Sequence, residues 1–153
     1  MKQLAAFAKK FRNKRQSAVS CWLGDIGAVG PSERVVEIAR KAGYSPQSIE
    51  DFFQISRRTA ARVLAYVQKE SLAYGERRYR EGLAREMDAM LGELGPDAQF
   101  WSNSRHSDFE AHTPAFTPDN AWMWIGLTDS TFDTGIIAFN ETTGFIFWIE
   151  EKD

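Results

Sequence analysis

The sequence predicts an α+β protein in which helices come first and a small antiparallel sheet follows. Over most of residues 2–95, apolar side chains recur at spacings of three and four, as they do on one face of a helix. After Gly95 and Pro96 the pattern changes to short apolar runs that are rich in Trp, Ile and Phe and separated by turn residues. We therefore expect a helical N-terminal half, followed by a three-stranded antiparallel sheet packed with helices.

The first expected helix covers residues 2–20. One side of it is apolar, with Leu4, Phe7, Ala8 and Phe11 at helical spacing. The other side is basic and carries Lys9, Lys10, Arg12, Lys14 and Arg15. The next segment, residues 24–31, contains three glycines and a proline, and is expected to be a loop.

Three shorter helices are expected next, at residues 32–41, 46–53 and 57–70. Each begins after or at a residue that commonly starts a helix: Ser32, the pair Ser45 and Pro46, and Ser56. A serine hydroxyl at such a position accepts a hydrogen bond from a backbone N–H that the first turn leaves unpaired. Each helix then shows an apolar face.

Residues 70–95 remain helical in pattern, and we expect two helices that meet near Gly75. The apolar runs that follow predict strands over residues 121–129, 134–141 and 144–151. In the third run, Phe145, Phe147 and Ile149 alternate with Ile146 and Trp148. Because both faces of this strand are apolar, we expect both to be covered.

Charge divides the chain into two unlike halves, although the net charge is only −2. Residues 1–69 hold 13 basic and 5 acidic side chains, whereas residues 70–153 hold 6 basic and 16 acidic ones. Such asymmetry predicts that the halves face different partners or each other. We expect a basic helical part at residues 1–70, a connecting helix at 71–95, and an acidic, aromatic-rich sheet part at 96–153.

Residues 32–67 resemble the helix-turn-helix DNA-binding proteins of bacteria and phages. The resemblance is strongest in ISRRTAARVL, residues 55–64, where a hydrophobic residue and a serine close the turn. It implies that the recognition helix begins there and places four side chains against DNA: Arg57, Arg58, Thr59 and Arg62. It departs from that family at Glu50, where the family has a small residue, and at Gln54, where it has glycine. The basic residues of the first helix would add phosphate contacts.

Two further groups of residues are candidates for binding. His106, Asp108, Glu110 and His112 alternate, so in an extended strand they would share one side and could bind zinc or manganese. A solvated polar loop is the interpretation we prefer, and we expect no metal or cofactor. Trp122, Trp124 and Trp148 belong to the aromatic-rich part, which predicts a packed core and also a surface for a protein partner.

Two functions compete on these observations. The first is a DNA-binding transcriptional regulator of plasmid or phage type, whose acidic part forms a homodimer or binds a partner. The second is a small inhibitor or immunity-type protein that binds and blocks a protein partner, such as a nucleic-acid-handling enzyme, and does not bind DNA. No nucleophile motif is present, so we expect no enzymatic activity. A single cysteine and the absence of a long apolar run favour a cytoplasmic protein without membrane contact.

Overall fold

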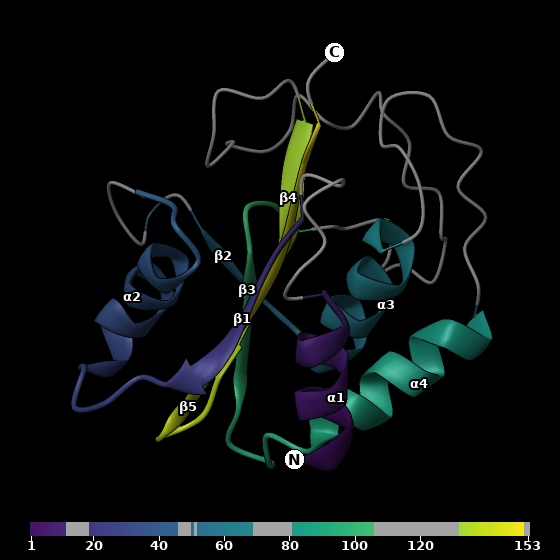
Figure 1. Ribbon diagram of the computed structural model, residues 1–153, viewed down its shortest axis with the longest axis horizontal. Coiled ribbons are helices and arrows are strands. Elements are labelled where there is room, and N and C mark those ends of the chain that lie inside the picture. The colour runs from purple at the N-terminus through teal and green to yellow at the C-terminus, as the bar shows by residue number, and fades with distance from the viewer. Residues whose placement is uncertain (12–18, 46–49, 51, 69–80, 106–131, 152–153) are drawn as a thin grey trace.

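The protein forms an α+β fold around a five-stranded antiparallel sheet (Figure 1). The computed structural model describes residues 1–11, 19–45, 50, 52–68, 81–105 and 132–151. Its helices are α1 (Lys2–Phe11), the short 3-10 helix η1 (Pro31–Glu33), α2 (Arg34–Lys41), α3 (Arg57–Val67) and α4 (Glu81–Gly92). Its strands are β1 (Val19–Asp25), β2 (Phe53–Ile55), β3 (Gln99–Ser102), β4 (Phe132–Phe139) and β5 (Thr143–Glu151).

The strands lie in the order β1-β5-β4-β3-β2, and every neighbouring pair is antiparallel. A tight turn joins β4 to β5, and Asn140 organises it. The Oδ1 atom of Asn140 accepts the backbone N–H groups of Thr142 at 3.0 Å and Thr143 at 2.8 Å. An Asn side chain at a turn commonly bonds the backbone two residues ahead in this way.

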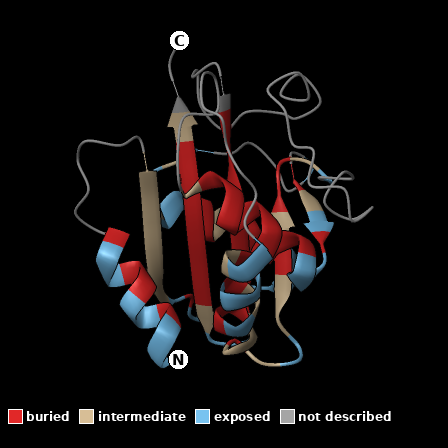
Figure 2. Ribbon diagram, turned by 90° about the vertical axis from the view of Figure 1, so that its right-hand side faces the viewer, coloured by how far each residue is buried: buried red, intermediate tan, exposed pale blue. Residues whose placement is uncertain are grey.

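Helices cover both faces of the sheet: α1, α3 and α4 lie on one face and α2 lies on the other (Figure 1). The side chains of β5 alternate accordingly. Phe145, Phe147 and Ile149 enter the core beneath α1, α3 and α4, while Ile146 and Trp148 enter the core beneath α2. This alternation confirms the expectation that both faces of the strand are covered. Figure 2 shows that burial is concentrated in the central strands and in α3.

The strand β1 replaces parts of the helix and loop that we expected at residues 2–20 and 24–31. The helix α1 covers Lys2–Phe11, and all seven residues of β1 pair with β5. Within β1, Val19, Cys21 and Leu23 pack on one core and Trp22 on the other. The local pattern was misleading because the partner of this strand lies at residues 143–149, far along the chain.

A second difference concerns the segment before α3. Phe53–Ile55 forms β2 and pairs with Phe100–Ser102 of β3, so the end of the expected helix at 46–53 and the expected turn at Gln54 are wrong. Residues 46–49 and 51 lie outside the described part of the chain. The sheet has five strands and not the three expected, because β1, β2 and β3 join it. The sheet takes strands from both the predicted basic part, residues 1–70, and the predicted acidic part, residues 96–153.

The expected strands at residues 134–141 and 144–151 correspond to β4 and β5. The expected strand at 121–129 lies outside the described residues. Among the helices that the structure describes, none is long and apolar enough to cross a membrane.

Candidate functional site: an arginine-lined groove

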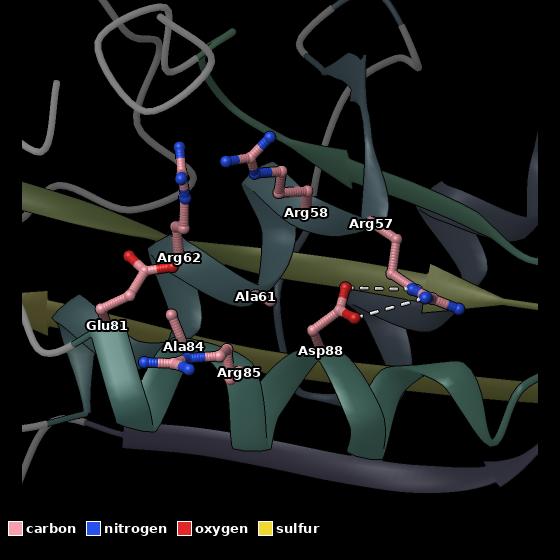
Figure 3. Close-up of a pocket in the computed structure, with 8 residues that line it drawn as sticks. All are labelled: Arg57, Arg58, Ala61, Arg62, Glu81, Ala84, Arg85 and Asp88. Atoms are coloured by element: carbon pink, nitrogen blue, oxygen red, sulfur yellow. Dashed lines mark hydrogen bonds and ion pairs between the residues drawn. The ribbon is translucent and has the colours of Figure 1, made fainter. Parts of the chain in front are cut away.

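A groove lies between α3 and α4, and four arginines line it (Figure 3). Its cavity volume is about 340 Å³. We call it the arginine groove; it is lined by Arg57, Arg58, Ala61, Arg62, Glu81, Ala84, Arg85 and Asp88. Four guanidinium groups against two carboxylates give it a formal charge of +2.

The first wall of the groove is α3, and a serine fixes where that helix begins. Ser56 has extended backbone angles, φ −74° and ψ 158°, and its Oγ accepts the backbone N–H of Thr59 at 3.0 Å. This is the N-cap that the sequence predicted. The helix that follows is embedded in the protein, since residues 59–67 are all buried. In α3, only Arg57 and Arg58 are exposed.

The second wall is α4, which packs an apolar side inward and turns a charged side to the groove. Ala84, Met87, Met90 and Leu91 are buried. Glu81, Arg85 and Asp88 line the groove and lie three or four residues apart, so they share one face of the helix. The floor between the two helices is formed by small side chains, Ala61 and Ala84. Their size leaves the space that the arginines surround.

An ion pair joins the two walls. The Nε atom of Arg57 lies 3.1 Å from Oδ1 of Asp88, and a second guanidinium nitrogen lies 3.3 Å from Oδ2, so the contact is bidentate. The two side chains are 46% and 38% exposed. An ion pair this exposed contributes about 0–1 kcal/mol to stability. Its main effect is to hold both side chains at one end of the groove.

The other arginines extend away from that pair. Figure 3 shows Arg58 and Arg62 pointing to the same side of α3, while Arg85 lies along α4. Arg62 is buried, with only 7% of its surface exposed. Arg58 and Arg85 are exposed. A guanidinium group offers five N–H donors in a planar fork, which matches the two oxygens of a carboxylate or a phosphate.

The structure places the residues predicted to contact DNA in several environments. Arg57, Arg58 and Arg62 come together in the arginine groove, whereas Thr59 is 1% exposed and takes part in the cap. Lys9 and Lys10 are exposed on α1, which lies beside the groove-forming helices and does not line the groove. Arg12, Lys14 and Arg15 lie outside the described residues.

The predicted partner and metal residues are also placed only in part. Trp148 is a core residue with no exposed surface, and its Nε1 donates to Oδ1 of Asp133 at 3.0 Å. It packs against Phe52 and Tyr44 inside the protein, so it is not available to a protein partner. Trp122, Trp124 and the residues His106, Asp108, Glu110 and His112 lie outside the described part. Elsewhere in the chain, the described residues contain no cluster of three or more possible metal ligands.

Sequence reasoning missed the contribution of α4 to this site. Glu81 and Arg85 lie four residues apart, a spacing that places them on one charged face of a helix. Ala84 and Asp88 lie on the same face. A small residue such as Ala84 between charged ones was the available signal for a groove. No protein family, curated protein or solved structure matches this chain.

Proposed function

We propose that this protein is a small inhibitor or immunity-type protein that binds a protein partner, and that it does not read DNA bases. The observation that carries the proposal is the burial of α3. A recognition helix must present several side chains along one face to the edges of the bases in the major groove. In α3, residues 59–67 are buried, including Thr59 and Arg62, and the exposed Arg57 is engaged by Asp88.

The arginine groove also has features of a protein-binding surface. Arginine is enriched among the residues that contribute most to protein–protein affinity, and it does so in well-packed pockets. The groove combines such arginines with an aliphatic floor and two carboxylates. DNA phosphates are bound by Lys and Arg side chains, and carboxylates among them weaken that attraction. The mixed charge here favours a polypeptide partner.

The experiment measures DNA and protein binding with the same preparation of the full chain. Anisotropy of a labelled random-sequence DNA duplex is recorded at about 50 mM salt, where contacts to phosphates are strong. In parallel, the immobilised chain is incubated with a nuclease-treated lysate of the source organism, and a captured protein is purified and recombined with it.

We expect no DNA binding, together with a one-to-one complex formed by the purified partner. DNA binding that weakens steeply with salt and is lost in the Arg57→Ala, Arg58→Ala double variant would support the regulator hypothesis instead. Failure to form a complex with any purified protein would also contradict the proposal.

A further inference from the structure

We propose that the arginine groove binds an acidic segment of a polypeptide, whose carboxylates pair with Arg58 and Arg85. This inference rests on the proposed function, because it names the chemistry of the partner. Charge is unevenly paired inside the groove. Both oxygens of Asp88 are occupied by Arg57. Among the residues that the structure describes, Arg58 and Arg85 have no carboxylate partner, although Asp88 and Glu81 line the same groove.

The size of the groove restricts what can enter it. Binding pockets for small ligands have volumes of about 300–1,000 Å³, and this groove, at about 340 Å³, lies at the lower end of that range. It therefore has room inside for a few side chains and not for a whole helix. An extended segment that places two or three side chains between α3 and α4 fits this volume.

The carboxylates of the groove favour a peptide over a nucleic-acid strand. Glu81 offers an acceptor beside the arginines, and a phosphodiester backbone has no N–H group to donate to it. A peptide carries an N–H at each residue other than proline, and these groups can donate to Glu81 while the acidic side chains accept from the arginines. The methyl groups of Ala61 and Ala84 offer an apolar floor to the aliphatic stems of glutamate side chains.

The groove is also held in shape before anything binds. The buried residues of α3 and α4 pack into one core, and the pair between Arg57 and Asp88 adds a contact on the exposed side. A site whose walls are already fixed loses less conformational entropy on binding than one that must be ordered. Only the exposed ends of Arg58 and Arg85 must be immobilised by the ligand.

The test uses a fluorescein-labelled hexaglutamate peptide and the full chain, at about 20 mM salt, where charge screening is weak. We expect saturable binding, and a loss of affinity of at least about tenfold in the double variant Arg58→Glu, Arg85→Glu, because charge reversal adds repulsion to the lost attraction. The neutral variant Arg58→Gln, Arg85→Gln should lose affinity to a smaller extent. Circular dichroism establishes that each variant is folded.

Arg40→Glu, Lys41→Glu is the matched control. It makes the same change of charge on exposed residues of α2, on the opposite face of the sheet. We expect it to change the affinity for hexaglutamate by less than about twofold. An equal loss in this control and in the groove variant would mean that the peptide responds to net charge alone, and would overturn the proposal.

Two competitors identify the ligand class. Inorganic phosphate and a single-stranded oligothymidylate are each titrated against the bound peptide. Weak competition by both supports the acidic polypeptide, whereas tighter binding of oligothymidylate that depends on the same arginines would assign the groove to nucleic acid.

The outcome is separate from that of the proposed function. Hexaglutamate binding lost in the groove variants supports the site even if no partner protein is found. A partner that still binds the charge-reversed variant with unchanged affinity would show that the partner uses another surface, and would overturn the link between the two.

Discussion

Tyr44 shows how much a single side chain can depend on its surroundings. It follows α2, packs near Trp148, and its hydroxyl donates to Oγ of Ser20 at 2.8 Å in the edge strand β1. The pKa of Tyr44 is raised from its usual 10.0 to about 12: burial is the largest cause, the hydrogen bond to Ser20 opposes it, and the charges of Glu150 and Asp133 add to the rise. The neutral phenol is therefore the form that the fold stabilises.

This gives a pH dependence of stability with a defined sign. The folded pKa of Tyr44 lies above its unfolded value, so its contribution is fully present below about pH 10 and is lost as pH rises toward about 12. We expect the free energy of unfolding to fall over that window, and tyrosinate absorbance to show a late ionisation step near pH 12. In Tyr44→Phe the late step should disappear. If it persists, another tyrosine is responsible.

Buried polar side chains where β3 meets β4 are also stabilised by hydrogen bonds. Asn103 donates to the carbonyl of Asp133 at 2.8 Å and accepts from the hydroxyl of Thr134 at 2.8 Å, and Ser102 donates to the carbonyl of Gly135 at 2.6 Å. Each of these side chains is buried and paired, as buried polar groups must be. No sequence pattern predicts such contacts, because β3 and β4 bring together residues about 30 positions apart.

At the scale of the element, α3 could be predicted with its start because its signals are local. The serine cap, the polar first turn and the apolar spacing all lie within one short stretch, and the structure has them all. Part of α4 was predicted for the same reason. In contrast, β1 and β2 were missed because a strand on its own satisfies only half of its backbone, and the partner that satisfies the rest is distant.

The cap of α3 can be tested directly. Ser56→Ala removes the acceptor for the Thr59 N–H and should lower the free energy of unfolding by about 1 kcal/mol, whereas Ser56→Gly should cost only a few tenths. Urea unfolding of both variants measures the difference. Ser32→Ala is the control: Ser32 was expected to cap the next helix, but it lies exposed within η1 and the N-cap of α2 is Glu33. A loss at Ser32 equal to that at Ser56 would contradict this assignment.

At the scale of the whole molecule, the two oppositely charged halves contact each other at specific points. Arg57 from the basic half meets Asp88 from the acidic half. Glu93, just after α4, accepts the backbone N–H groups of Gln3 at 3.1 Å and Leu4 at 2.8 Å, so it caps α1 from 89 residues away. The charge asymmetry predicted that the halves could face each other. It did not predict which charges meet, because that depends on how the helices pack.

Glu93 therefore offers a test of long-range capping. Glu93→Ala should destabilise the protein by about 1–2 kcal/mol. An anion at a helix start accepts hydrogen bonds from unpaired N–H groups and is attracted by the positive end of the helix dipole. Amide hydrogen exchange should accelerate in α1 more than in α3. Glu86→Ala, an exposed position on α4, should leave exchange in α1 unchanged. Equal acceleration in both helices would indicate general destabilisation in place of a lost cap.

The place of β5 within the sheet has a consequence for how a newly synthesised chain folds. This strand follows the other four in the chain, yet it lies between β1 and β4. Until residues 143–151 have left the ribosome, β1 lacks its partner strand, and Trp22 and Leu23 lack their paired residues Ile146 and Phe145. Closing a sheet across so long a separation is slow, and partly folded chains with open strand edges aggregate. We therefore expect the sheet to close only after β5 has left the ribosome, and chaperones to bind the chain before then.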